Sequence, residues 1–523
     1  MAVEKRVVSG LYRDSVTLMQ CASRVEALPG VEKAGAMMAT PANLDLARDA
    51  GLLQASESVE AGPNDLLLLV QTIDAADADA AFQEAERILT EVPKAAAGDE
   101  RAEVAPRSIR MGLAAKPDAS LVLVSTPGEY AASEAIKALH LGMDAMVFSD
   151  NVSVADEIEM KRLAHDAGLL LMGPDCGTAI IGGVPLGFAN VVRRGDIGVI
   201  GASGTGTQQV TALIDRWGAG VTHAIGTGSH DLSADVGAVT MLDALSALEA
   251  DSETKVLVLV SKPPSPEVAE RVLAAASAAR TPSVVCFLGA DPASIERPGV
   301  TAAETLEDAA ALAVELSTGE APPGAADAAD GAAAKAAADA LAPSQRFIRG
   351  LYSGGTFGYE AALLLSARLG AVHSNTPARP EDAIADVWKS VGHTVIDLGD
   401  DVFTRGRPHP MIDFRLRVDR IAEEAQDSEV AVVLLDCVLG YGAHEDPAGQ
   451  LVPAIVAARQ SAEADGRRIA FVASVCGTEG DPQGLAGQER ALRDAGVLLG
   501  RSNAHAARIA ADIVASHEGS EPQ

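Results

Sequence analysis

Short apolar runs alternate with longer amphipathic stretches along most of the chain. From residue 120 onward, runs such as SLVLVSTPG and TKVLVLVSK are each followed by a segment with helical periodicity. Uniformly apolar strands separated by amphipathic helices predict a parallel sheet that is covered on both faces. The alternation occurs in three blocks, residues 108–195, 196–317 and 346–516. We predict an α/β protein, with a Rossmann-like domain for the first block and a flavodoxin-like domain for each of the others.

The remaining segments have different patterns. Residues 1–100 contain three predicted strands and two predicted helices, which indicates a small, ACT-like α+β domain. Residues 95–108 are expected to form a hinge or exposed linker. Residues 318–345, rich in Ala, Gly and Pro, predict a second linker with a short alanine-rich helix inside it. Residues 176–195 have no clear period and predict an irregular excursion.

Composition narrows the possible functions. The chain has 523 residues, too many for one core, and a formal net charge of -32. Such an acidic chain is a poor match for nucleic-acid phosphates, and most of its acidic side chains are expected on solvated helix faces. No apolar run is long enough to cross a bilayer and no signal-peptide core is visible, so we expect a cytoplasmic protein that does not bind membranes. The five cysteines are scattered, which favours buried thiols over disulfides or a metal site.

Two copies of a small-residue turn each follow a predicted strand, GASGTGT at residues 201–207 and YSGGTFG at residues 352–358. Open α/β sheets bind ligands at the carboxyl ends of their strands, where a helix start offers free N–H groups to an anion. Helix capping alone is the alternative explanation. Neither turn is a Walker A loop or has the G-x-G-x-x-G spacing. The candidate phosphate-binding residues are Ser203, Gly204, Thr205, Gly206, Thr207, Ser353, Gly354, Gly355 and Thr356.

Polar clusters follow two other predicted strands. GPDCGT holds Asp175 and Cys176, and the cysteine is either a nucleophile or a structural thiol. GTGSHDLSAD holds His230 and Asp231, and this histidine is either a general base or a surface loop residue.

Three loops in the last block carry further candidates. TRGRPHPMID contains Arg405, Arg407 and His409, a combination that suits an anionic substrate. DCVLGYGAHEDP contains His444. The acidic side chains of SVCGTEGDPQG are either solvated or able to hold Mg²⁺.

These motifs together resemble the FdrA family over nearly the whole chain. The resemblance rests on LMGPDCGTAIIGGVPLGFANVVRRGDIGVIGASGTGTQQV, AIGTGSHDLSAD, LYSGGTFGYEA, GRPHPMID, LDCVLGYGAHEDPA and VCGTEGDPQG. FdrA proteins are distant relatives of succinyl-CoA synthetase. Residues 119–317 resemble part of its α subunit, which implies a CoA-binding-like fold for residues 108–195, and residues from 346 onward resemble the ligase domain of its β subunit. In that enzyme the two corresponding helix starts face one phosphohistidine loop, so the resemblance implies that the two turns converge on one anion.

Three departures from the synthetase change what the resemblance implies. The position of the phosphohistidine loop is occupied by ADPASIERPGV, which has no histidine. The glycine-rich CoA-binding turn that opens the α subunit is replaced by the small α+β domain, and the ATP-grasp region of the β subunit is absent. A covalent phosphohistidine relay is therefore not expected at its usual place.

FdrA family members are identified as one component of a multi-subunit oxamate carbamoyltransferase of allantoin breakdown. The resemblance thus implies that oxalurate and phosphate react to give oxamate and carbamoyl phosphate, with other subunits as partners in an oligomer. The polar loops at the strand ends supply the candidate catalytic residues, His230, Asp231 and His409. These loops also supply the candidate set that binds the small anionic substrate, namely Asp175, Cys176, Arg405 and Arg407. Phosphate is the expected co-substrate, with CoA and Mg²⁺ as open candidates. Alternatives are an acyl-CoA synthetase whose nucleotide binds to another chain, and a non-catalytic scaffold.

Overall fold

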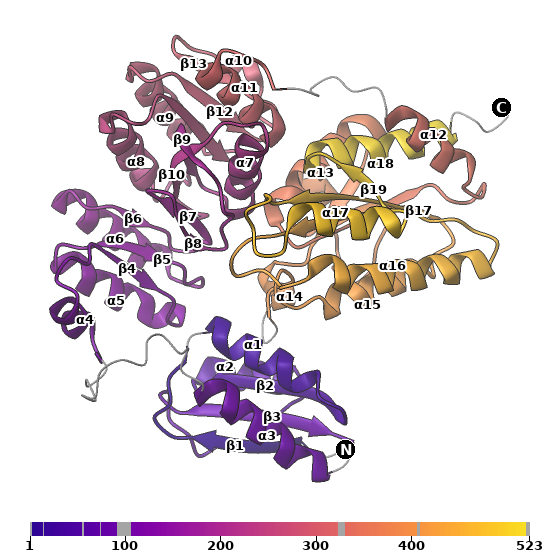
Figure 1. Ribbon diagram of the computed structural model, residues 1–523, viewed down its shortest axis with the longest axis horizontal. Helices are drawn as coiled ribbons and strands as arrows, with labels where there is room; N and C mark the ends of the chain where they lie inside the picture. The colour runs from indigo at the N-terminus through magenta and orange to yellow at the C-terminus, as the bar shows by residue number, and fades with distance from the viewer. Residues whose placement is uncertain are drawn as a thin grey trace. The chain divides into compact units, whose positions relative to one another are not determined.

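The computed structural model describes residues 3–13, 15–54, 57–73, 75–90, 106–322, 330–404 and 408–518. These residues form two compact units, each described by itself (Figure 1). The smaller unit comprises Met1–Ala119, Ser125–Pro127 and Asp401–Asp413, and the larger unit comprises the rest. Within the described ranges, no helix combines the length and apolarity needed to cross a bilayer.

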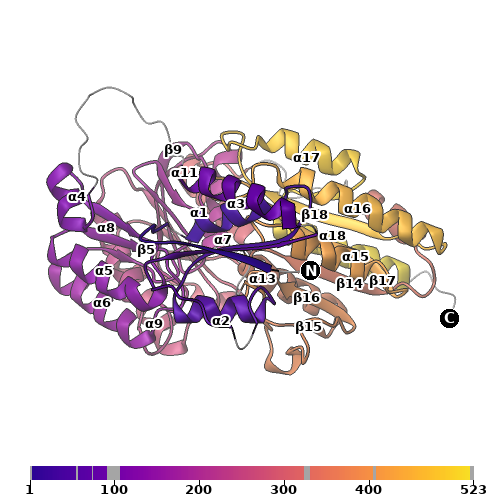
Figure 2. The same cartoon turned by 90° about the horizontal axis from the view of Figure 1, so that it is seen from below.

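The smaller unit is built on an antiparallel sheet in the order β1-β3-β2. Its elements are β1 (Val3–Val8), α1 (Ser15–Glu26), β2 (Val31–Met38), α2 (Pro41–Asp49), β3 (Leu66–Thr72), α3 (Ala75–Thr90), α4 (Ile109–Ala115) and α14 (Asp401–Thr404). The central strand β3 is apolar throughout because successive side chains enter opposite cores, Leu68 beneath α1 and α3 and Leu69 beneath α2 (Figure 2). The predicted small α+β domain is confirmed. Most of the predicted hinge, residues 95–105, lies outside the described residues.

The larger unit begins with a three-stranded parallel sheet in the order β4-β5-β6. Its elements are β4 (Leu121–Val124), α5 (Gly128–His140), β5 (Asp144–Val147), α6 (Val154–Ala167) and β6 (Leu171–Met172). The expectation of an irregular excursion over residues 176–195 was wrong. A hairpin of β7 (Thr178–Ile181) and β8 (Val184–Gly187) forms there, because Gly182 and Gly183 adopt the positive φ angles of a tight turn. The hairpin joins the next sheet through β7.

The second sheet has the order β13-β12-β11-β9-β10-β7-β8. Its remaining elements are β9 (Arg194–Gly201), α7 (Gly204–Arg216), β10 (Val221–Gly226), α8 (Val239–Ala250), β11 (Val256–Ser261), α9 (Pro266–Ala278), β12 (Ser283–Phe287), α10 (Pro292–Ile295), β13 (Val300–Ala302) and α11 (Leu306–Thr318). The five strands from β9 to β13 are parallel to their neighbours and follow the flavodoxin-like order 2-1-3-4-5. The predicted flavodoxin-like fold is therefore confirmed for this block.

The third sheet has the order β15-β16-β14-β17-β18-β19 and is entirely parallel. Its elements are β14 (Phe347–Tyr352), α13 (Gly355–Leu369), β15 (Val372–Ser374), a 3-10 turn (Pro380–Asp382), β16 (His393–Asp397), α15 (Arg415–Glu424), β17 (Val430–Val438), α16 (Pro447–Ala464), β18 (Ala470–Cys476), α17 (Leu485–Asp494), β19 (Leu498–Gly500) and α18 (Asn503–Glu518). The same 2-1-3-4-5 order recurs, with β15 added at one edge. The predicted alanine-rich helix before this block is present as α12 (Asp330–Asp339).

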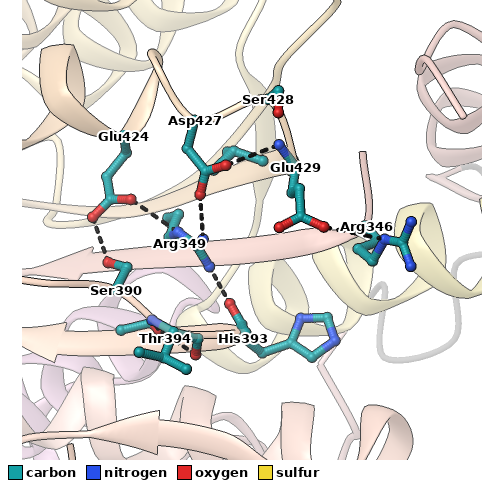
Figure 3. Close-up of polar contacts among 12 residues, drawn as sticks. Arg346, Arg349, Ser390, His393, Thr394, Glu424, Asp427, Ser428 and Glu429 are labelled. Carbon is teal, nitrogen blue, oxygen red and sulfur yellow. Dashed lines mark hydrogen bonds and ion pairs between the residues drawn. The ribbon is translucent and has the colours of Figure 1, made fainter. Parts of the chain in front are cut away.

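A buried ion network anchors α15 beneath the third sheet (Figure 3). The guanidinium of Arg349 on β14 has an exposed side-chain fraction of 2 % and donates to Glu424 at 2.9 Å and to Asp427 at 2.7 Å. Glu424 also accepts hydrogen bonds from Ser390 and from Arg420. Because buried charges are costly without partners, this network ties the helix to the strand and to the loop before β16.

Candidate functional site

The first small-residue turn lies at the switch point of the second sheet, where the strand order reverses between β9 and β11. Ser203 has extended backbone and is the N-cap of α7, with its Oγ accepting from the Gly206 amide at 2.9 Å. The Thr207 hydroxyl donates to the Ser203 carbonyl at 2.7 Å. A Cβ on Gly201 would lie 2.0 Å from Thr207 Oγ1, so glycine is needed for this tight approach. Ligands bind such sheets at this switch point.

The second turn, between β14 and α13, is held by an internal carboxylate. The backbone amides of Ser353 and Gly354 both donate to Asp436 at 2.9 Å, and the Ser353 hydroxyl donates at 2.8 Å. Arg417 pairs with Asp436 at 2.9 Å, and both side chains are buried. These two amides are therefore already bonded. The expected phosphate-binding role of Ser353 and Gly354 is corrected on this ground, because a buried carboxylate takes the place of the anion.

The two turns meet directly, as the resemblance implied. Ser203 Oγ and Thr356 Oγ1 share a hydrogen bond of 2.6 Å, and α7 packs against α13 (Figure 1). A Cβ on Gly354 would lie 2.8 Å from Thr205 Cγ2, so glycine permits the close approach of the two helix starts. The two flavodoxin-like blocks are thus joined through the residues singled out in the sequence.

A small pocket opens beside the first turn. Its volume is about 160 Å³, including solvent space at the mouth, and its lining residues are Asp175, Cys176, Gly177, Thr178, Gly201, Ser203, Gly204, Gly226 and Gly228. Four predicted site residues therefore line one cavity. Pockets for drug-sized ligands have volumes of about 300–1,000 Å³. The pocket has no room for a whole CoA molecule, and its lining includes an acidic residue, Asp175.

The chemistry of Cys176 in this pocket is that of a protonated thiol. Its exposed fraction is 2 %, and its Sγ donates to the Thr178 carbonyl at 3.6 Å. Burial, the largest cause, raises the pKa of the thiol to about 12. A Cβ on Gly226 would lie 2.5 Å from the sulfur, which shows how closely the backbone surrounds it. Of the two interpretations left open, the structural thiol fits this environment.

The structure gives Asp231 a structural role. Asp231 is fully buried, pairs with Lys161 at 2.7 Å and accepts from the amides of Thr240 and Met241 at the start of α8. These contacts engage both carboxylate oxygens of Asp231, and its catalytic role stays a prediction. His230 is largely exposed, with its Nδ1 3.5 Å from Glu157. Neither residue lines the pocket.

The predicted arginine loop is described only in part. Arg405 and Arg407 lie outside the described residues. His409 belongs to the smaller unit, and its Nδ1 accepts from the Met411 amide at 3.2 Å.

The carboxylate of Asp481 is used to hold a neighbouring loop. It accepts from the Asn190 side chain at 2.7 Å, from the Val191 amide at 2.7 Å and from the Thr478 amide at 2.8 Å. Burial raises its pKa, against the effect of these hydrogen bonds. Within the described ranges, no group of three or more His, Cys, Asp or Glu residues could hold a metal ion. The Mg²⁺ expected as an alternative for this loop therefore has no matching ligand set.

Sequence reasoning missed two charged residues near the joined turns. Lys262 directly follows β11, and its Nζ lies 5.6 Å from the ring centroid of Tyr359 on α13. Asp397 ends β16, and burial raises its pKa to about 7 while the charge of Lys262 acts in the opposite direction. The signal for Lys262 was present, because TKVLVLVSK places a lysine at the carboxyl end of a predicted strand.

Family models match three parts of the chain. A CoA-ligase model matches residues 351–513, and a CoA-binding-domain model matches residues 192–289. The CoA-binding match thus falls on the second sheet, whereas the CoA-binding-like fold was expected for residues 108–195. A model described as the AllF heavy metal-associated domain matches residues 1–106.

One relative aligns with the whole chain. YahF of Escherichia coli is 41% identical over 520 residues, which covers 99% of this chain and 100% of YahF. The chain belongs to the YahF family of CoA-ligase-related proteins. A more distant relative of this family is SauD, a subunit of the ADP-forming sulfoacetate-CoA ligase of Bilophila wadsworthia. It is 27% identical over 35% of this chain and 63% of its own length. The α subunit of the ADP-forming succinate–CoA ligase of Staphylococcus epidermidis is 28% identical over 28% of this chain and 48% of its own length. The relation to succinyl-CoA synthetase is confirmed.

The N-terminal domain of this family member does not fit a heavy metal. Residues 1–106 contain one cysteine, Cys21, and no histidine. Cys21 is fully buried, and burial raises its pKa to about 11. Soft metals bind through thiolate, imidazole or thioether ligands, and this domain offers one buried thiol and no imidazole.

Proposed function

We propose that the chain is the phosphate-binding subunit of a multi-subunit carbamoyltransferase that converts oxalurate and phosphate into oxamate and carbamoyl phosphate. The proposal follows the resemblance to the FdrA family. The observation that carries it is the Ser203–Thr356 contact beside a pocket of about 160 Å³, since a paired helix start next to a small cavity suits phosphate.

The proposed reaction needs no covalent intermediate on the protein. A phosphate oxygen attacks the carbamoyl carbon of oxalurate, the bond from that carbon to the oxamate nitrogen breaks, and the phosphate proton passes to the leaving nitrogen. This step requires positioning and stabilisation of the developing oxyanion. It is consistent with a pocket whose one cysteine is protonated and whose described lining contains no histidine.

An acid–CoA ligase is the second candidate, because CoA-ligase and CoA-binding models match this chain. Such a ligase would need nucleotide and CoA, with partner subunits supplying their sites. The residues that occupy the phosphohistidine position, 290–300, contain no histidine. This difference favours the carbamoyl transfer.

The two candidates are separated by their products. The full chain, isolated with the subunits that co-purify with it, is incubated with oxalurate and phosphate, and carbamoyl phosphate is measured. A parallel reaction contains an acid, ATP and CoA, and thioester formation is measured. Carbamoyl phosphate without thioester is expected. Thioester formation without carbamoyl phosphate would contradict the proposal.

A matched pair of variants tests the turn itself. Ser203→Ala removes the cap and the hydroxyl that contacts Thr356, and activity is expected to fall at least tenfold. Ser153→Ala removes an equivalent cap on α6, where the serine accepts from the Asp156 amide at 3.1 Å, outside the pocket. Each cap is worth about 1 kcal/mol, so stability should change similarly in both variants and activity in only one. Equal activities would remove Ser203 from the mechanism.

A further inference from the structure

We infer that Lys262 is the cation that binds the anion at the Ser203 turn. This inference deepens the proposed function and rests on it. In the sequence analysis, the positive charge for an anionic ligand was expected from Arg405 and Arg407. We now place that charge on Lys262, at the carboxyl end of β11. The inferred ligand is a small oxyanion of the phosphate class.

The sheet register brings Lys262 next to Ser203. Strands β9 and β11 are parallel neighbours in which Gly201 is paired with Val260, and the Ala202 amide donates to the Val260 carbonyl at 2.9 Å. Ser203 and Lys262 each lie two residues beyond this pair. Neighbouring strands are about 4.8 Å apart, so the two residues leave the sheet side by side at its switch point.

Both residues then contact the same face of α13. Ser203 bonds to Thr356, and the ammonium of Lys262 lies 5.6 Å from the ring centroid of Tyr359. Thr356 and Tyr359 are three residues apart and are therefore neighbours on the helix surface. Ser203 and Lys262 therefore both contact the N-terminal part of α13.

Lys262 has one acidic neighbour that acts on its charge among the described residues, the buried carboxyl group of Asp397. Lys262 is half-buried, and none of the described residues gives it a hydrogen bond or an ion pair. Other lysines of this unit are paired: Lys161 with Asp231 at 2.7 Å, and Lys255, at the opposite end of β11, with Asp196 at 3.9 Å. In a chain with 73 acidic and 41 basic residues, an unpaired, half-buried lysine at a switch point fits an anionic ligand.

Asp397 lies on the other side of the α13 start and modulates this site. A Cβ on Gly355 would lie 2.3 Å from Asp397 Oδ2, so the carboxyl group touches the first residue of the helix. Burial raises its pKa to about 7, Lys262 and the Gly399 amide oppose that rise, and Asp400 and Asp436 reinforce it. When ionised, Asp397 competes with the ligand for Lys262, so anion affinity should increase as the pH falls through about 7.

The test uses inorganic phosphate titrated into the full chain by calorimetry. Lys262→Met keeps the apolar stem on Tyr359 and removes the charge, and affinity is expected to fall about ten- to hundredfold, the value of one charged hydrogen bond. Lys262→Arg should stay close to the wild type. Lys255→Met, a matched control on the same strand, should leave affinity unchanged. Sulfate, whose charge is constant between pH 6 and pH 8, serves as the probe for the effect of Asp397.

The outcomes distinguish this inference from the proposed function. Phosphate binding that is unchanged in Lys262→Met would overturn the role of Lys262 and leave the carbamoyltransferase intact. Binding that is lost in Lys262→Met, in a complex that makes no carbamoyl phosphate, would support the anion site and overturn the proposed reaction. A wild-type chain that binds no phosphate would overturn both. Unchanged unfolding midpoints in the variants would show that the fold is preserved.

Discussion

Two aspartates flank the start of α13, and the same substitution is expected to change stability in opposite directions at the two positions. Asp436 has an exposed fraction of 1% and pairs with Arg417, which is fully buried. Asp397 has an exposed fraction of 7%, and none of the described residues forms an ion pair with it. Asp436→Asn leaves a buried guanidinium without its counter-charge. Asp397→Asn removes a buried charge that Lys262 stabilises only in part and without an ion pair.

The magnitudes follow from burial. Breaking a buried pair by removing one partner costs about 3–5 kcal/mol, which is the loss expected for Asp436→Asn. Burial raises the pKa of Asp397 from 3.8 to about 7. Between these pH values the folded state binds more protons than the unfolded state, so wild-type stability falls as the pH rises. Asp397→Asn does not lose stability in this way. Its free energy of unfolding should exceed that of the wild type by about 4 kcal/mol at pH 8 and by about half as much at pH 5.5.

Urea unfolding at pH 5.5 and pH 8 measures both effects. The two tryptophans, Trp217 and Trp388, lie in the larger unit and report its unfolding by fluorescence. Asp436→Asn should lower the midpoint at both pH values, and Asp397→Asn should raise it, more at pH 8. A gain for Asp397→Asn that is the same at both pH values, or a loss for both variants, would refute the assignment of an only partly compensated charge to Asp397.

Three further predictions concern the pocket, the ion network and the joined turns. Cys176→Ser should retain activity, and the wild-type thiol should resist iodoacetamide at pH 7.5, because its pKa is about 12; rapid labelling would contradict this. Glu424→Gln should cost about 3–5 kcal/mol in urea unfolding because it leaves buried arginines underpaired, whereas the half-exposed Glu429→Gln should cost at most about 1 kcal/mol. Gly354→Val places a Cβ 2.8 Å from Thr205 Cγ2 and should cost about 1–3 kcal/mol and weaken phosphate binding in calorimetry; unchanged binding would show that the turns need not touch.

The covered parallel sheets of the two larger blocks could be expected from the sequence because apolar strands alternate with amphipathic helices. β17, VAVVLLDCV, is buried at every position, which only a strand covered on both faces requires. The hairpin of β7 and β8 was missed because its strands are only four residues long and their alternation is weak. The signal that could have found it is the Gly182-Gly183 pair between two short apolar runs, a common two-residue hairpin turn.

Some features of the candidate site could be predicted from residues adjacent in sequence, and others depend on contacts between distant residues. The turn at Ser203 could be predicted because a strand, a small-residue turn and a helix are adjacent in sequence. The hydrogen bonds from the second turn to Asp436 could not be predicted. Asp436 is 83 residues from Ser353, and only the pairing of β14 with β17 brings the two residues together. Lys262 was visible as a strand-end lysine, but its lack of an ion-pair partner among the described residues depends on contacts between two blocks.

The two turns occupy equivalent places in sheets of the same strand order, which would suggest two anion sites. Their chemistry differs, however, and this difference explains why we expect a bound anion at the first turn only. At the second turn, the amides of Ser353 and Gly354 are taken by Asp436, whose charge is in turn balanced by Arg417. At the first turn, Ser203 lines a pocket, and the nearby cation, Lys262, interacts with the carboxyl group of Asp397 without forming an ion pair or hydrogen bond among the described residues. A carboxylate and a guanidinium inside the protein thus make the second turn rigid. Because the second turn is held by Asp436 and does not bind and release an external anion, Thr356 can keep the Ser203 hydroxyl in one position. A turn that bound and released its own ligand would move, and the geometry at Ser203 would move with it.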